Sequence, residues 1–525
     1  MQTSLLSLIQ KNQPRRALLT SYTLSVSWFE TFALPALRRY GCEQVDLLVD
    51  YRKANESTQE AASQYAGSAY RIIPVFMPTG GIFHPKIAYF EGTRSDSTDT
   101  LIIGSGNLTH AGQGKNLEIF DAVDHDHHPH VFGEFADFLK HFSARYKFST
   151  ENLKALKHFE KRARAKGETD LRADHDTRTT WLVHTLDRSA AVQLTELAAG
   201  TLELPAALTV LAPYHSPSGG PVARLAHALE VTDLRIGLSG GSRAAPFKQD
   251  ILELPEYVTY VVPVTADGHR FAHAKHFEVR SSEASLLMTG SINATAQSLE
   301  TTKNVEISLV RKMPVSPLDW ENVQPAVFVP CDFTDENHEK GLLSLQASWT
   351  SDNWVQGTVM PAGSPQVVEL SVWDGDVCLA VRPDVEISAL GDFRVRMAGF
   401  PDANDALVLQ LENEEVCVRG WLNMEYELSG SLINRSLIRS SGKLISGNYT
   451  IDDLKAVFLW MESLLAGKPE HAEPLNKQKV NTNSGNANFP PPGTANVSYD
   501  DWCAEALEQS TGSTSKAAFV KLVVA

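Results

Sequence analysis

The amino-acid sequence predicts an α/β fold built from two related halves, followed by a β-rich region. Apolar strands alternate with amphipathic helices through the first 330 residues, which favours sheets covered by helices on both faces. A composite sequence pattern also occurs twice, about 190 residues apart. A repeat of this length is too long for a solenoid and indicates two domains that form one unit.

Each copy of the repeat begins with an apolar strand, followed by a tyrosine and a helix. The first copy starts at RALLTSYTLSVSWFETFALPALRRYG and the second at LTVLAPYHSPSGGPVARLAHALE. A further strand follows in each copy (VDLLVDYR and LRIGLSG), and each copy then reaches a His-x-Lys and a Gly-Ser-x-Asn. The order of elements is therefore the same in both halves.

The sequence pattern changes after residue 330, where short β-prone segments alternate with turns. This spacing predicts an antiparallel sandwich or barrel. A helical pattern and a stretch rich in Pro, Asn and Gly come after it. The predicted divisions are a first repeat at 1–165, a second repeat at 166–330, an acidic sandwich-like β domain at 331–448, a helix at 449–467, a flexible linker at 468–498 and a C-terminal segment at 499–525.

Composition is that of a globular protein in a reducing compartment. Of the 525 residues, 43% are hydrophobic and 21% are charged, and no apolar run approaches the length of a membrane span. The first 16 residues place basic side chains after a short apolar stretch, which is the reverse of a signal peptide. The five cysteines are scattered without CxxC spacing, which argues against a disulfide framework or a thiolate zinc site. We expect a cytoplasmic protein that does not engage a membrane.

The net charge of −16 is concentrated in the last third of the chain. Residues 331–525 contain 14 Lys and Arg against 27 Asp and Glu, whereas residues 1–330 contain 33 against 36. A strongly anionic surface repels phosphate backbones. We therefore expect the last third to dock a protein partner, or else to shield the site, and we favour docking.

The duplicated His-x-Lys supplies the chemistry. Residues i and i+2 of a strand point to the same face, so His84 projects together with Lys86, and His273 with Lys275. If the halves pack face to face, two imidazoles and two ammonium groups meet. One imidazole can then attack phosphorus while the other protonates the leaving oxygen. The set suits a phosphodiester, and it needs neither a metal nor a cofactor.

The Gly-Ser-x-Asn turns add polar groups to the same place. The amides of Asn107 and Asn293 can approach an anion closely. Ser105 and Ser291 either donate to the phosphate or cap their own turns.

These residues resemble the phospholipase D superfamily, whose members carry two HxK…GSxN motifs in one chain or across a dimer. The resemblance covers about residues 15–325. It implies two α-β-α sandwich repeats and a phosphohistidine intermediate, with His84 as the nucleophile and His273 as the general acid. The residues that match the motifs are His84, Lys86 and Asn107 in the first copy and His273, Lys275 and Asn293 in the second.

One departure from that pattern bears on the substrate. Lipid-hydrolysing members have an aspartate five residues after the lysine, where this chain has Glu91 and Arg280. Tyrosyl-DNA phosphodiesterases also lack that aspartate. The sequence therefore favours a metal-independent nuclease acting on nucleic acid, DNA rather than RNA. The family analogy further suggests an effector subunit of a bacterial antiviral defence assembly. The alternatives are a phospholipase D-type lipid hydrolase and a subunit that is silent until a partner delivers substrate.

Two glutamates complete the expected site. In the family, a carboxylate or amide from one repeat orients the histidine of the other. Glu118 and Glu306 match those positions, so we expect Glu306 to bond His84 and Glu118 to bond His273. Such a carboxylate fixes the imidazole tautomer and favours its protonated form. The alternative is that both are solvated strand residues.

Three acidic or histidine-rich segments have simpler interpretations. DHDHHPH at 124–130 offers ligands for a metal, but its place before a helical pattern favours a helix cap. The aspartates at 374–376 and 402–405 are better explained as turns than as calcium loops.

Overall fold

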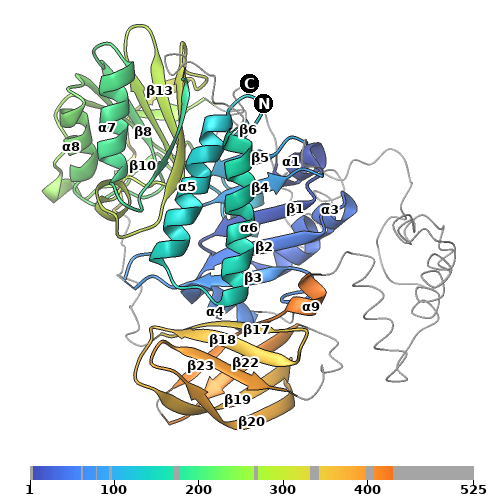
Figure 1. Cartoon of the computed structure of the whole chain (residues 1–525). Coiled ribbons are helices and arrows are strands. Elements are labelled where there is room, and N and C mark those ends of the chain that lie inside the picture. The colour runs from blue at the N-terminus through green and yellow to red at the C-terminus, as the bar shows by residue number, and fades with distance from the viewer. Residues whose placement is uncertain are drawn as a thin grey trace, which may run out of the picture.

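The computed structural model of the chain describes residues 4–60, 63–78, 80–93, 97–168, 178–264, 270–330, 342–397, 406–414 and 416–429. Two mixed α/β units lie against each other, and a β module lies below the first of them (Figure 1). The predicted helix at 449–467, linker at 468–498 and segment at 499–525 lie outside the described residues. In the described part of the chain, no helix is long and apolar enough to cross a membrane.

The first unit contains a six-stranded mixed sheet with the order β3-β2-β1-β4-β5-β6. Strands β1, β2 and β3 are parallel, whereas β4, β5 and β6 run antiparallel to their neighbours. Nearly every strand residue is buried, as expected for a sheet covered on both faces. The strands are β1 (Arg16–Ser21), β2 (Gln44–Asp50), β3 (Arg71–Val75), β4 (Ile87–Glu91), β5 (Thr100–Gly104) and β6 (Phe120–Asp124).

Helices cover the two faces of this sheet in two separate apolar cores. One face packs on α1 (Leu5–Asn12) and on a helical run formed by α2 (Val26–Trp28), a π-helical turn at Phe29–Ala33 and α3 (Leu34–Arg39). The other face packs on the antiparallel pair α5 (Pro129–Arg145) and α6 (Thr150–Gly167). Helix α4 (Tyr51–Glu60) follows β2 directly.

The second unit repeats this topology within an eight-stranded sheet of order β15-β11-β9-β8-β12-β13-β14-β7. The run β11-β9-β8-β12-β13-β14 matches β3-β2-β1-β4-β5-β6 in both order and direction. The sequence duplication is therefore a duplication of topology. The strands are β7 (Thr180–His184), β8 (Ala207–Leu211), β9 (Asp233–Gly237), β11 (Val258–Pro263), β12 (His276–Arg280), β13 (Ser285–Gly290), β14 (Ile307–Met313) and β15 (Trp320–Val323).

Smaller elements complete this unit. Helices α7 (Ala190–Thr201) and α8 (Gly220–Ala228) pack in its apolar core, and the two-residue strands β10 (Ala244–Ala245) and β16 (Val327–Phe328) pair with each other.

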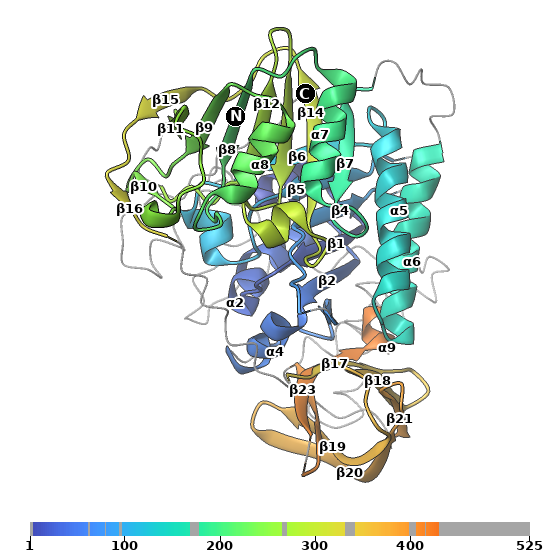
Figure 2. The same cartoon turned by 90° about the vertical axis from the view of Figure 1, so that its left-hand side faces the viewer.

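The two units meet through a pair of equivalent backbone bridges. Phe83 pairs with Val305, and Leu117 pairs with Ala272. Each bridge joins the residue before a motif histidine in one unit to the residue before a motif glutamate in the other. The bridges therefore relate the units by a local twofold relationship and align the two motif copies. Figure 2 shows the second unit above the first, with α5 and α6 alongside.

The third module is one seven-stranded sheet of order β20-β19-β22-β23-β17-β18-β21, curled around its own core. The edge strands β20 and β21 approach each other and nearly close the sheet, so of the two predicted forms, sandwich or barrel, the module is closer to a barrel. Strands β17 and β23 pair in parallel, which the long connection between them permits. The elements are β17 (Ser344–Trp349), β18 (Trp354–Met360), β19 (Gln366–Asp374), β20 (Val377–Ile387), β21 (Asp392–Arg396), β22 (Leu407–Glu412), β23 (Cys417–Met424) and α9 (Glu425–Leu428).

This module is joined to the first unit by buried polar contacts. Arg71 on β3 bonds Asp46 at 2.9 Å and forms a bidentate pair with Glu425. Burial disfavours the charge of Arg71, but the two carboxylates outweigh it and raise the pKa of Arg71 above its ordinary value. The side chain of Asn423 donates to Ile72 O (3.0 Å) and accepts from Ile72 N (3.2 Å). The module is thus packed into the first unit rather than tethered to it.

Candidate active site

The segment that carries His84 is held in place from both units. It lies just before β4, where the backbone N–H of Phe83 donates to Asp50 Oδ2 at 3.0 Å. The backbone N–H of His84 donates across the interface to Val305 O, also at 3.0 Å. In the second unit, the backbone N–H of His273 donates to Leu117 O at the same distance. Both histidines are therefore positioned by the unit to which they do not belong.

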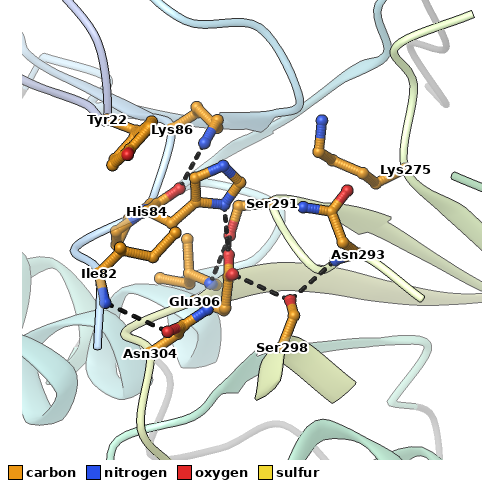
Figure 3. Close-up of polar contacts among 12 residues, drawn as sticks. Tyr22, Ile82, His84, Lys86, Lys275, Ser291, Asn293, Ser298, Asn304 and Glu306 are labelled. Carbon is orange, nitrogen blue, oxygen red and sulfur yellow. Dashed lines mark hydrogen bonds and ion pairs between the residues drawn. The ribbon is translucent and has the colours of Figure 1, made fainter. Parts of the chain in front are cut away.

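The imidazole of His84 is bonded to a buried carboxylate of the other unit. Its Nδ1 lies 2.8 Å from Glu306 Oε2 (Figure 3). Glu306 also accepts from Ser291 Oγ at 2.5 Å and from Ser298 Oγ at 2.9 Å. Burial raises the pKa of Glu306, but His84 and the other donors outweigh it, so the net pKa is lowered and the group is ionised. Because a carboxylate only accepts, Nδ1 carries the proton and Nε2 keeps its lone pair.

The second half-site mirrors the first. His273 Nδ1 lies 2.7 Å from Glu118 Oε1, and Glu118 also accepts from Ser105 Oγ at 2.5 Å. The crossed pairing expected from the sequence is therefore present on both sides. Burial again raises the pKa of Glu118, and His273 outweighs it, so the net pKa is lowered.

The hydroxyl protons of Ser105 and Ser291 are engaged within the protein, which disfavours the first of the two expected roles, donation to a phosphate. Each donates its proton to the carboxylate of its own unit and accepts from the backbone N–H of Ile119 or Ile307, at 3.0 Å in both cases. They support the glutamates.

Two buried ammonium groups lie between the half-sites. Lys86 Nζ donates to His84 O at 2.7 Å, and Lys275 Nζ donates to His273 O at 2.9 Å. Burial lowers the pKa of Lys275 to about 8. The pKa of Lys86 is lowered well below its ordinary value by burial and by the charge of Lys275. Two buried amines whose charged forms are disfavoured hold their protons more firmly beside an anion, so the pair suits an anionic group.

Burial decides the protonation state of both histidines. It lowers the pKa of His84 to about 4 against the opposing effect of Glu306, and Lys86 lowers it further. The pKa of His273 is also lowered, by burial and by Lys275, against Glu118. The expectation that the carboxylates keep the imidazoles protonated is therefore wrong for the ligand-free protein, in which both rings are neutral near pH 7.

The two motif asparagines have different surroundings. Asn107 Oδ1 accepts from the backbone N–H of Tyr22 at 3.2 Å, which fixes the amide against the end of β1. Asn293 is buried beside Lys275 (Figure 3), and its Oδ1 has no hydrogen-bond partner. An unpaired buried amide is costly in free energy unless a ligand satisfies it.

Sequence reasoning missed two aromatic neighbours of the histidines. The ring centroid of Tyr22 lies 5.5 Å from that of His84, and Tyr214 lies 6.1 Å from His273. Lys53 Nζ lies 5.9 Å from the centre of the Tyr22 ring. The available signal was that a tyrosine follows the first strand of each repeat.

The positions that depart from the lipase pattern have structural partners. Glu91 Oε2 lies 2.6 Å from His158 Nε2 on α6, and Arg280 lies 3.9 Å from Asp233 on β9. Both tie strand ends to neighbouring elements.

The other candidate sites do not assemble. In the histidine-rich segment, His127 Nδ1 bonds Asp124 at 2.6 Å in an exposed turn before α5, and His128 lies 3.4 Å from Arg311. Among the described residues there is no group of three or more potential metal ligands. The aspartates at 374–376 flank the β19–β20 turn, and those at 402–405 lie outside the described residues.

A cavity of about 1090 Å³ lies away from the histidines, between the start of α6 and the third module. Within the described residues its lining contains no histidine or cysteine, and it is formed by Lys147–Glu151 together with parts of β17 to β21. The cluster of buried titratable side chains around the two histidines is therefore the candidate site.

No protein-family model and no curated protein matches this chain. Among solved structures, two of yeast tyrosyl-DNA phosphodiesterase align with 61% of this chain and with 88% and 89% of their own, at 12% identity and TM-scores of 0.37 and 0.35. Polyphosphate kinase from Porphyromonas gingivalis aligns with 59% of this chain and 46% of its own, at 12% identity and a TM-score of 0.30. Likeness at this level does not establish a shared fold, so the site is interpreted from its own geometry.

Proposed function

We propose that this chain is a phosphodiesterase of the phospholipase D type that cleaves nucleic acid without a metal, through a phosphohistidine. The observation that carries the proposal is the crossed arrangement of His84 with Glu306 and of His273 with Glu118 around two buried lysines. An in-line displacement at phosphorus requires a neutral imidazole that attacks, a second imidazole that can carry a proton to the leaving oxygen, and amines that can be charged beside the phosphate.

In the first step, His84 Nε2 attacks phosphorus. Its Nδ1 proton is held by Glu306, which stabilises the positive charge that develops on the ring. The N–P bond forms as the bond to the leaving oxygen breaks, and His273 gives that oxygen its proton. Binding of an anionic diester raises the pKa of His273 and supplies the protonated ring that this step needs.

In the second step, His273 takes a proton from water, and the resulting hydroxide attacks the phosphohistidine. The N–P bond breaks, a phosphomonoester leaves, and His84 returns to its neutral form. Lys86, Lys275 and the amides of Asn107 and Asn293 stabilise the non-bridging phosphate oxygens in both steps.

Nucleic acid, and DNA rather than RNA, is the substrate class that we propose. The support is that the lipase-type aspartate is replaced by Glu91 and Arg280, which are used structurally. Docking of a protein partner on the acidic last third, and a place in a bacterial defence assembly, are further parts of this proposal.

The test is incubation of the purified full chain with labelled single- and double-stranded DNA, RNA and phosphatidylcholine vesicles, all in excess EDTA. We expect cleavage of nucleic acid, and a rate lowered about 10³-fold or more in His84→Ala and in His273→Ala. We also expect labelled phosphate from the substrate to become attached to His84 through a bond that acid breaks. Activity that EDTA abolishes, or that survives both substitutions, would contradict the proposal.

A further inference from the structure

An exposed aromatic ring lies beside the second histidine. Phe271 is 51% exposed, and its ring centroid lies 6.3 Å from that of His273, with the ring planes inclined at 37°. Phe271 belongs to none of the apolar cores formed by the described residues. Its ring therefore contributes little to packing, and its exposure keeps apolar surface in water.

The backbone beneath this ring is fixed on both sides. The carbonyl of Phe271 accepts from the N–H of Leu117 in the other unit at 2.9 Å. The N–H of Ala272, the next residue, donates to Ser239 Oγ at 2.8 Å. The backbone at Phe271 is thus held by hydrogen bonds while its large apolar side chain lies in solvent. Phe271 is one residue away from the bridge between Leu117 and Ala272 that joins the units.

The first unit has no such ring at the equivalent position. Ile82 occupies it, because the carbonyl of Ile82 accepts from Val305 N at 3.0 Å just as that of Phe271 accepts from Leu117 N. Ile82 is half-buried and aliphatic. Of the two equivalent positions, Ile82 and Phe271, only the one beside His273 therefore carries an exposed aromatic ring.

We propose that Phe271 is the stacking platform for the nucleobase that flanks the scissile phosphate on its leaving-group side. The inference rests on the proposed function and on the role of His273 as the general acid. A flat exposed ring can stack on any base, but only on one that has left its own helical stack. The preferred substrate is therefore single-stranded or frayed nucleic acid rather than the interior of a duplex.

Binding tests this separately from cleavage. In full-length protein carrying His84→Ala, fluorescence anisotropy would measure affinity for single-stranded oligothymidine and for a base-free oligomer of equal length made of tetrahydrofuran phosphates. We expect the bases to strengthen binding about 5- to 100-fold, as aromatic stacking does. Phe271→Ala and Phe271→Leu should remove that preference, and Phe271→Trp should restore it, while binding of the base-free oligomer stays unchanged.

The matched control is Tyr257→Ala. Tyr257 is 47% exposed and precedes β11, at the opposite end of that strand from the segment leading to His273. We expect this change to leave both affinities as they were.

The outcomes separate the two proposals. Base-dependent binding through Phe271 without cleavage by the unsubstituted chain would contradict the nuclease and leave the platform standing. Cleavage with equal affinity for both oligomers, or equal losses for both in Phe271→Ala, would overturn the platform and leave the nuclease standing.

Discussion

At His84, burial and the carboxylate of Glu306 act on the imidazole in opposite directions, and burial has the larger effect on its pKa. The carboxylate still decides which nitrogen carries the proton. The outcome is a neutral ring with its Nε2 lone pair available, which is the state a nucleophile needs. The partner of each histidine was predicted through the family resemblance, in which a carboxylate of one repeat orients the histidine of the other. The sequence could not predict the direction of the pKa shift, because that depends on how much water the folded chain excludes.

Replacing Glu306 by glutamine should lower kcat by about 10²- to 10⁴-fold. The amide can donate to Nδ1, which moves the imidazole proton to Nε2 and removes the attacking lone pair. The thermal unfolding midpoint measures any loss of stability, and rapid-quench kinetics measure the rate of the chemical step. The two measurements separate a change in stability from a change in catalysis. Ser298→Ala, which removes one of the other donors to the same carboxylate, should have a much smaller effect on kcat. Equal losses in the two variants would contradict this assignment.

A buried histidine outside the candidate site makes stability depend on pH. His215 is fully buried, neither ring nitrogen has a hydrogen-bond partner, and burial lowers its pKa from 6.5 to about 3. In the unfolded chain, His215 binds a proton more readily than in the folded protein. The contribution of neutral His215 to stability is therefore fully present above pH 6.5 and is lost as the pH falls towards 3. The loss is about 1.4 kcal/mol for each pH unit in that window.

His215→Leu should remove that part of the pH dependence. Leucine is the matched choice, because Leu24 pairs with Leu108 in the first unit as His215 pairs with Ala294 in the second. Urea unfolding of both proteins at pH 7 and pH 5 gives the comparison. A variant with the same drop in unfolding free energy as the parent would show that His215 is not a source of acid sensitivity.

At the scale of elements, the repeated strand order was predictable and the junction between the repeats was not. Apolar strands such as TLIIG and SLLMTG are recognisable because almost every residue is buried. The bridges at Phe83 and Leu117 are single residue pairs without periodicity, and they form only once the two units have packed. The choice between a sandwich and a barrel stayed open for a similar reason, since short strands specify a sheet but not whether it splits or curls.

An asparagine lies two residues before each motif glutamate, Asn116 in the first repeat and Asn304 in the second, and these residues offer a test of the junctions. Asn304 Oδ1 accepts from Ile82 N at 3.1 Å, across the units and two residues from His84 (Figure 3). Asn304→Ala should lower kcat about tenfold with a small change in thermal midpoint, because a displaced nucleophile loses alignment. Asn116→Ala is the matched control: its side chain contacts Glu118 within its own unit at 3.3 Å, so we expect a smaller loss. Equal kcat values in the two variants would contradict a positioning role for Asn304.

At the scale of the whole molecule, the third module contacts the first unit on the side away from the second (Figures 1 and 2). Its described residues therefore do not shield the histidines. Ala406, Val408 and Trp421 lie in the same apolar core as α1 and α3. Counting charges along the sequence set the last third of the chain apart as acidic, but it could not reveal that residues of this region complete an apolar core of the first unit.

Deleting residues 331–525 should consequently destabilise the protein rather than merely remove a docking surface. The milder test is Glu425→Gln in the full chain, which weakens the bidentate contact of buried Arg71 and should cost roughly 1.5–3 kcal/mol of unfolding free energy. Glu386→Gln, at an exposed position of the same module, should cost almost nothing. Denaturant unfolding of both variants measures the two free energies of unfolding. Equal stability of the two variants would refute an integral role for the module.

The crossed carboxylates also bear on how such a chain can arise. One half alone has a histidine without its glutamate, whereas two identical halves related by a twofold axis would complete both sites at once. A homodimer of one half would therefore form both histidine–glutamate pairs, and gene duplication with fusion would preserve these contacts. In a homodimer, every substitution enters both sites together. After fusion, equivalent positions can diverge, as Ile82 and Phe271 or Leu24 and His215 have done. In the proposed mechanism, inheritance on a single chain would allow one histidine to specialise as nucleophile and the other as acid.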